Sequence, residues 1–127
     1  MKETKICVIG LGYVGLPLAR LFSTKYKTVG YDMSVKRCEA LMAGHDATLE
    51  VPDELLQDAI SNHGFICTAN IDEIRDCNFY IVAVPTPYDK FSKKIDANYV
   101  IAAVKEIMKV CHKGATVVIE STVSPGT

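Results

Sequence analysis

The feature that most constrains the fold is a regular alternation of short apolar runs with longer amphipathic stretches. The apolar runs predict strands at Lys5–Ile9, Lys27–Tyr31, Phe65–Thr68, Phe79–Val84 and Ala115–Ile119. Such runs are typical of strands that are buried on both faces, as in a parallel sheet. Strands that alternate with helices are joined by right-handed crossovers. We therefore predict an α/β fold, a Rossmann-like doubly wound parallel sheet in three layers, α/β/α.

The stretches between these runs show helical periodicity. A first helix is expected from Tyr13 or Val14, and a second runs to Met42 with Ser34 as its N-cap. Pro52 is expected as the first residue of a third helix, because proline suits that position. The pattern further predicts one helical turn over 71–75, a polar loop over 88–95 and a fourth helix over 97–111.

A glycine pattern follows the first predicted strand and opens the first helix. Residues 10–15 read G-L-G-Y-V-G and match the dinucleotide-binding sequence G-x-G-x-x-G in the context that it requires. Gly10 allows a tight turn, Gly12 lets a pyrophosphate approach the backbone, and Gly15 lets the helix pack closely on the strand. The free N–H groups at the helix N-terminus attract phosphate. The alternative is a plain glycine-rich turn.

An acidic residue lies at the end of the second predicted strand. Asp32 stands about 20 residues after Gly10, where a carboxylate binds the ribose hydroxyls of NAD and repels the 2′-phosphate of NADP. Two alternatives remain open at this point. Asp32 could cap the next helix instead, and the neighbouring Lys36 and Arg37 could accept a 2′-phosphate. The prediction is NAD.

Composition limits the partners and the compartment. The formal charge of −1 gives no support for broad electrostatic binding to nucleic acid or to an anionic membrane, and no apolar run approaches the roughly 20 residues that span a bilayer. The five cysteines are odd in number and contain no C-x-x-C pair, which favours a reduced, cytoplasmic protein. The three histidines have no ligand spacing with the cysteines, so we expect no metal site.

Three segments resemble one enzyme family. Residues 5–17 are similar to the opening of the nucleotide-sugar 6-dehydrogenases, the UDP-glucose/GDP-mannose dehydrogenase family. Residues 82–87, V-A-V-P-T-P, resemble the family's V-P-T-P segment, and residues 120–127 resemble its S-T-V-x-x-G-T segment. Glu120 and the ending S-P-G-T look most like the UDP-N-acetylhexosamine branch. The resemblance covers essentially the whole chain, but only the family's N-terminal domain.

The resemblance implies a function for that domain. Members of the family oxidise the C6 alcohol of a UDP-sugar to a carboxylate with two NAD, and a cysteine holds the intermediate. None of the five cysteines matches that nucleophile, so residues 1–127 are expected to form an NAD-binding Rossmann domain of a longer enzyme and to be inactive alone. The full-length enzyme is expected to be a homo-oligomer.

The resemblance also implies roles for particular residues. Tyr13 and Val14 are expected to cover the pyrophosphate, while Asp32 and Arg37 lie near the adenosine ribose. Thr86, Ser121 and Thr122 fall at strand ends, where Ser121 and Thr122 are expected to face the nicotinamide side. Thr122 is the residue expected to touch the chemistry, in a supporting role only. The alternative for the loop hydroxyls is that they satisfy backbone groups.

Two other functions remain as alternatives. The cofactor domain of a β-hydroxyacid dehydrogenase also begins with strand, glycines and helix, but it does not predict the V-P-T-P and S-T-V segments. A stand-alone nucleotide-binding regulatory module is the alternative from outside the enzymes.

Overall fold

The sequence folds into alternating strands and helices. The computed structural model describes residues 4–12, 15–47, 50–83, 88–89, 94–95, 98–110 and 114–119. The elements in chain order are β1 (Lys5–Ile9), α1 (Gly15–Ser23), β2 (Lys27–Tyr31), α2 (Val35–Met42), α3 (Asp53–His63), β3 (Ile66–Thr68), the 3₁₀ helix η1 (Ile71–Ile74), β4 (Phe79–Val82), β5 (Tyr88–Asp89), β6 (Lys94–Ile95), α4 (Asn98–Val110) and β7 (Thr116–Ile119). Each predicted strand has its counterpart here.

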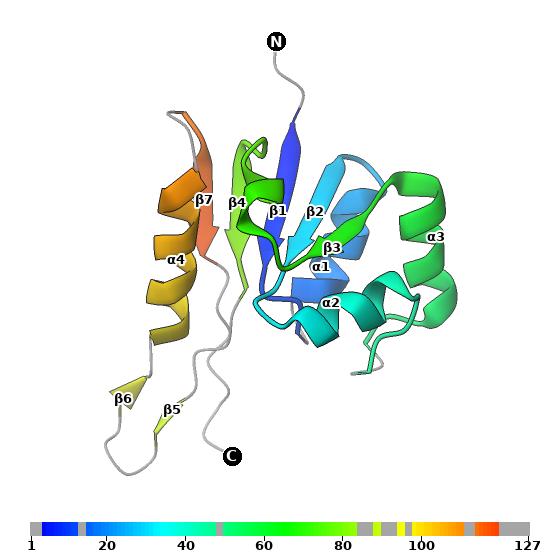
Figure 1. Cartoon of the computed structure of the whole chain (residues 1–127), viewed down its shortest axis with the longest axis horizontal. Helices are drawn as coiled ribbons and strands as arrows, with labels where there is room; N and C mark the ends of the chain where they lie inside the picture. Colours follow the sequence, from blue (N-terminus) through cyan, green and yellow to red (C-terminus); the bar gives the residue numbers. More distant parts are fainter. Residues whose placement is uncertain are drawn as a thin grey trace.

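Five of these strands form one parallel sheet. Its order is β3-β2-β1-β4-β7, and all four pairings are parallel (Figure 1). The chain builds outward from β1 to β3 on one side and then continues with β4 and β7 on the other. This order confirms the predicted doubly wound fold. The side of the sheet on which new strands are added switches between β1 and β4. Ligands of open α/β sheets bind at the carboxyl ends of the strands at such a switch point.

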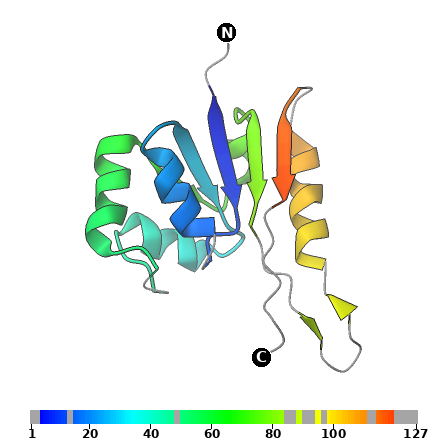
Figure 2. The same cartoon turned by 180° about the vertical axis from the view of Figure 1, so that it is seen from behind.

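Helices cover both faces of the sheet. Ile6 and Val8 of β1 point into one hydrophobic core, which also holds residues of α1, α2 and α3. The alternate residues Cys7 and Ile9 point into a second core with α4 and η1. Figure 1 shows α4 on one side of the sheet, and Figure 2, from behind, shows α1 on the other. The three-layer prediction is therefore confirmed, and the two-sided burial explains why the strand runs are continuously apolar.

Helix ends follow local chemistry with one correction. Ser34 caps α2 as predicted, because its hydroxyl accepts a hydrogen bond from the Arg37 amide at 3.2 Å. The prediction for Pro52 was wrong by one residue. Helix α3 begins at Asp53, and Pro52 has an extended ψ of 146°. Its carbonyl still accepts the first helical bond, from the Leu56 amide at 3.0 Å, so Pro52 occupies the N-cap rather than the first turn.

The segment predicted as a polar loop over 88–95 contains two short strands. β5 and β6 pair in antiparallel fashion, with Tyr88 opposite Ile95 and Asp89 opposite Lys94. Strands of two residues are held by hydrogen bonds between backbone N–H and C=O groups, and every non-proline residue carries both groups whatever its side chain. Hydropathy therefore gave no sign of them, and the prediction of an unpaired loop is corrected.

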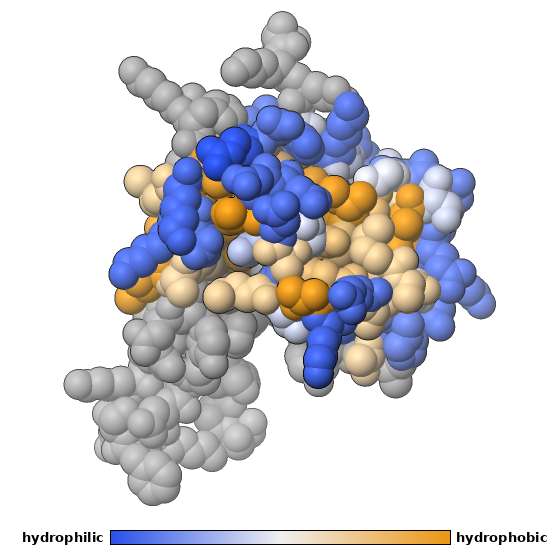
Figure 3. Space-filling model, viewed as in Figure 1, coloured by the Kyte–Doolittle hydropathy of each residue, from blue (hydrophilic) through white to orange (hydrophobic). Residues whose placement is uncertain are grey.

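Some apolar side chains stay on the surface. The larger ones include Ile101 and Met108 on α4, and Val117 and Ile119 on the edge strand β7. On the side of the molecule seen in Figure 3, hydrophobic residues gather towards the middle and hydrophilic residues surround them. None of the described helices is long and apolar enough to cross a bilayer.

Candidate functional site

The bend after β1 is built by two glycines that approach each other closely. Gly10 has a φ of 95°, in the left-handed region that disfavours side chains, and its amide donates to the Tyr31 carbonyl at 2.8 Å. At Gly15, an added Cβ would lie 1.7 Å from the Gly10 carbonyl oxygen and 3.2 Å from the Ala83 Cβ. The close approach of helix and strand predicted at Gly15 is therefore present.

Gly12 has a different environment. An added Cβ there would meet no described atom within 4 Å, so the absence of a side chain serves no contact within the described part of the chain. The Gly12 carbonyl accepts the Leu16 amide at 3.2 Å at the start of α1. Among the described residues, no atom outside its chain neighbours occupies the space beside Gly12 at the start of α1, as a pyrophosphate site requires.

Leu11, between these glycines, is held by its side chain and by both backbone polar groups. Its side chain is fully buried and packs on Gly30, where an added Cβ would lie 2.8 Å from the Leu11 Cδ2. Its amide donates to the Asp32 Oδ2 at 3.0 Å. Its carbonyl accepts from the Arg37 Nε at 2.9 Å and Nη2 at 2.6 Å. The bend is therefore fixed by the protein itself.

Asp32 lies where the sequence placed it, directly after β2 and next to the bend. Its Oδ1 accepts the Ser34 amide at 2.9 Å, and its own amide donates to the Thr68 carbonyl at 3.1 Å. The N-cap of α2 is Ser34, so Asp32 is not the helix cap that the alternative reading proposed. An ionised carboxylate offers about four lone-pair sites, and the two backbone N–H groups leave acceptor capacity for the hydroxyls of a ribose.

Arg37 is placed beside the same bend, but its side chain is already engaged. Besides the Leu11 carbonyl, the guanidinium binds Asp46 with an Nη1–Oδ1 distance of 2.9 Å. The side chain is only 16% exposed. The structure therefore gives Arg37 a positioning contact with the bend, which the sequence did not reveal.

Sequence reasoning missed Asp46 entirely. This residue lies in the connection between α2 and α3 and is completely buried. Its Oδ2 accepts the amides of Glu50 at 3.1 Å and Val51 at 3.0 Å. A polar residue in a short connection reads as solvated, and no periodicity marks this one as buried. A buried aspartate is nearly always paired with a cation, so its burial would have suggested a partner. The sequence alone does not reveal that burial.

Five of the predicted site residues lie outside the described residues: Tyr13, Val14, Thr86, Ser121 and Thr122. Their roles remain predictions. Gly10, Gly12, Gly15, Asp32 and Arg37 are described, and they meet at the carboxyl ends of β1 and β2. The donor set of this end fits a dinucleotide, with open backbone at a helix start and a carboxylate within the same small region.

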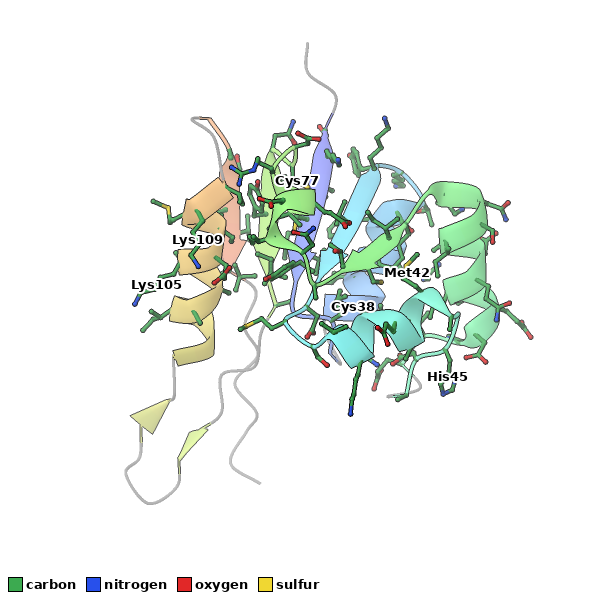
Figure 4. All side chains as sticks on the ribbon, in the orientation of Figure 1. Cys38, Met42, His45, Cys77, Lys105 and Lys109 are labelled. Carbon is green, nitrogen blue, oxygen red and sulfur yellow. The ribbon has the colours of Figure 1, made fainter. Side chains whose placement is uncertain are left out.

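The described cysteines are buried thiols. Cys7, Cys38, Cys67 and Cys77 are all free and buried, whereas Cys111 lies outside the described residues. Figure 4 shows Cys38 on α2 and Cys77 in the segment before β4. Burial raises the pKa of the Cys7 and Cys38 thiols and raises the pKa of Cys67 to about 12. A raised thiol pKa opposes formation of the nucleophilic thiolate.

Cys77 differs from the other thiols in one respect. A hydrogen bond with Cys7 lowers the pKa of Cys77, but its side chain is fully buried in the core. Among the described residues, no group of three or more His, Cys, Asp or Glu side chains is arranged to hold a metal ion.

Comparison with known proteins identifies the family. Residues 4–127 match the profile described as UDP-glucose/GDP-mannose dehydrogenase family, NAD binding domain. The chain belongs to this family. The match confirms the resemblance stated from the sequence, and it confirms NAD as the cofactor of the domain. It does not favour either alternative, the β-hydroxyacid dehydrogenase cofactor domain or the regulatory module.

Several relatives whose names state a sugar substrate match this chain over nearly its whole length. A UDP-N-acetyl-D-glucosamine 6-dehydrogenase of Pseudomonas aeruginosa is 45% identical over 126 residues, covering 99% of this chain and 29% of that protein. A UDP-N-acetyl-D-mannosamine dehydrogenase of Campylobacter jejuni is 36% identical, covering 97% of this chain and 30% of that protein. These relatives point to the UDP-N-acetylhexosamine branch of the family.

A solved structure agrees with the fold. The UDP-D-ManNAc dehydrogenase of Pyrococcus horikoshii superimposes with a TM-score of 0.85 at 32% identity, and the match covers 97% of this chain and 29% of that one. The chain thus spans about three tenths of the length of these family members. Its fold is that of the NAD-binding domain of the family.

Proposed function

We propose that the chain serves as the NAD-binding domain of an enzyme that oxidises the C6 alcohol of a UDP-N-acetylhexosamine to a uronic acid, with two NAD. The observation that carries the proposal is the open backbone at Gly12 beside the Asp32 carboxylate, at the start of α1. The sugar is proposed from the names of relatives that are 45% and 36% identical to the chain.

The chemistry divides between cofactor and chain. NAD⁺ would supply a hydride acceptor when bound, and the change from alcohol to carboxylate removes two hydride equivalents, which accounts for two NAD. The chain's own residues bind and orient. The α1 N-terminus and the backbone at Gly12 would hold the pyrophosphate, and the Asp32 carboxylate would accept hydrogen bonds from the hydroxyls of the adenosine ribose. Arg37 keeps the bend in shape through the Leu11 carbonyl.

The remaining site residues are proposed from their place in the sequence. In the sequence, Thr86 comes after β4, and Ser121 and Thr122 come after β7. The carboxyl ends of these two strands lie at the same edge of the parallel sheet as the end of β1. In this proposal Thr86, Ser121 and Thr122 line the nicotinamide side, and Thr122 supports the reaction. Tyr13 and Val14 cover the pyrophosphate.

The domain is proposed to act within a longer chain. Residues 1–127 form one Rossmann domain, and the substrate domain and the nucleophilic cysteine come from the rest of the enzyme. The share of about 29% covered in the relatives supports this, as do the apolar residues exposed on α4 and β7. The full-length enzyme is proposed to be a homo-oligomer that takes a UDP-sugar. The free thiols support a cytoplasmic location.

Titration with NAD⁺ tests the proposal at the cofactor site. Asp32→Ala removes the proposed ribose acceptor and is expected to weaken NAD⁺ binding by roughly tenfold or more, since hydrogen bonds to charged groups contribute about 1.5–3 kcal/mol. The matched control is Asp72→Ala, an exposed carboxylate that pairs with Arg75 at 2.7 Å. Its affinity is expected to equal that of the unmodified chain. Equal affinities for all three proteins would contradict the ribose contact.

Turnover tests the division between domains. The 127-residue chain is expected to bind NAD⁺ yet to release no NADH with UDP-N-acetylglucosamine or UDP-N-acetylmannosamine, followed by absorbance at 340 nm. Production of NADH by this chain, above that of a denatured sample, would contradict the assignment of the nucleophile to another domain.

A further inference from the structure

The buried ion pair between Arg37 and Asp46 supports the bend of the cofactor site from behind, through the Leu11 carbonyl. Asp46 is fully buried, and a buried carboxylate is costly unless it is paired and hydrogen-bonded. One of its oxygens binds Arg37, and the other accepts the backbone amides of Glu50 and Val51. The carboxylate is thereby anchored in the α2–α3 connection, so it acts as a fixed anion rather than a mobile one.

This anion fixes the orientation of the Arg37 guanidinium. Arg37 uses Nη1 on Asp46 and uses Nε and Nη2 on the Leu11 carbonyl, at 2.9, 2.9 and 2.6 Å. A guanidinium is a rigid plane, so three bonds to two partners leave it little freedom to turn. With a side chain only 16% exposed, Arg37 is held against the bend.

The place of Arg37 raises a question of cofactor choice. NADP differs from NAD by a phosphate on the adenosine ribose, and an arginine near the end of the second strand is a usual partner of that phosphate. Arg37 and Asp32 both bond to the backbone of Leu11, so the arginine lies close to the ribose acceptor. A free Arg37 would therefore oppose the selection against phosphate that Asp32 provides.

We propose that Asp46 is a specificity-determining positioning residue, which secures the preference for NAD by holding Arg37 on Leu11 and neutralising its charge. The proposal deepens the assignment of this site to NAD and rests on it. Asp46 itself touches no cofactor. It acts through Arg37, whose charge is paired with Asp46 and whose Nε–Nη2 fork is occupied by the Leu11 carbonyl, so neither is offered to a 2′-phosphate.

Asp46→Asn tests the proposal through the ratio of two dissociation constants, that of NADP⁺ divided by that of NAD⁺. An amide offers one acceptor oxygen in place of two and no charge, so the guanidinium loses its ionic partner and keeps only its bonds to the Leu11 carbonyl. The ratio is expected to fall by about tenfold or more, because a freed arginine forms charge-assisted bonds with phosphate. Isothermal titration of both nucleotides gives the ratio.

The matched control is Asp53→Asn, which removes one negative charge from the start of α3. Asp53 is about half exposed and pairs with His45 at 3.1 Å (Figure 4 labels His45). Its ratio is expected to stay within twofold of the unmodified chain. A merely structural Asp46 would lower the melting temperature and leave the ratio unchanged, and that result would overturn the proposal.

A double variant, Asp46→Asn with Arg37→Met, tests the same idea without an unpaired buried charge, even where the single variant does not fold. Its ratio is expected to lie within twofold of the unmodified chain, since the arginine is already unavailable there. A rise of fivefold would mean that Arg37 binds the 2′-phosphate in the unmodified protein. A fall would mean that Asp46 repels it directly. Either result overturns the proposal, whereas failure of the unmodified chain to bind NAD⁺ overturns the site assignment itself.

Discussion

Replacing Gly15 by alanine gives the sharpest test of the bend, because the clash can be measured. The new Cβ would lie 1.7 Å from the Gly10 carbonyl oxygen, whereas real Cβ contacts lie beyond 3.0 Å. The two segments must therefore separate by about 1.3 Å. Neither is free to move, since Gly10 is bonded to Tyr31 and α1 is packed through Leu16 and Ala19.

The expected cost follows from this rigidity. Overpacking a well-packed core costs about 1–3 kcal/mol and occasionally more, and a clash between backbone groups belongs at the upper end. For a domain of this size, about 3 kcal/mol corresponds to a fall of roughly 10 °C in melting temperature. NAD⁺ affinity should fall as well, because the same shift moves the start of α1 away from Gly12.

Gly12→Ala is the matched control for Gly15→Ala. Its Cβ meets no described atom, so the melting temperature is expected to change by no more than about 2 °C while NAD⁺ binding is lost. Differential scanning calorimetry and NAD⁺ titration on both variants separate the two effects. The reasoning is refuted if Gly15→Ala keeps the melting temperature of the unmodified chain, or if both variants lose the same stability.

Two further predictions concern stability. Burial raises the pKa of Cys67 to about 12 from an ordinary value of 9.0, so between these values the folded thiol stays protonated while the unfolded one ionises. The free energy of unfolding should therefore be fully retained below pH 9 and fall as the pH rises towards 12. Urea titrations across this range would show the decline, and Cys67→Ala should make it shallower; an identical slope in both proteins would contradict the assignment. Ser34→Ala removes the cap of α2 and should lower the free energy of unfolding by about 1 kcal/mol, whereas Ser34→Asn should restore most of it.

The sequence predicted those parts of the molecule that obey a local rule. Buried strands show as apolar runs, and the bend shows as glycines, because both depend on neighbours within a few residues. Asp46 obeys no such rule. Its burial depends on the Arg37 side chain nine residues earlier and on the fold of the connection around it. The hydrogen bond from the Leu11 amide to the Asp32 carboxylate is equally hidden, because it joins two strand ends that meet only in the sheet.

The way Leu11 is held has a consequence for the energetics of ligand capture. Its side chain is part of the core, its amide donates a hydrogen bond to Asp32, and its carbonyl accepts one from Arg37. The segment from Gly10 to Gly12 therefore takes its shape during folding, and a dinucleotide arriving later has little disorder left to remove there. Preorganisation of this kind leaves more of the contact energy as affinity. Substitutions at Leu11 should consequently lower both the melting temperature and the affinity for the dinucleotide.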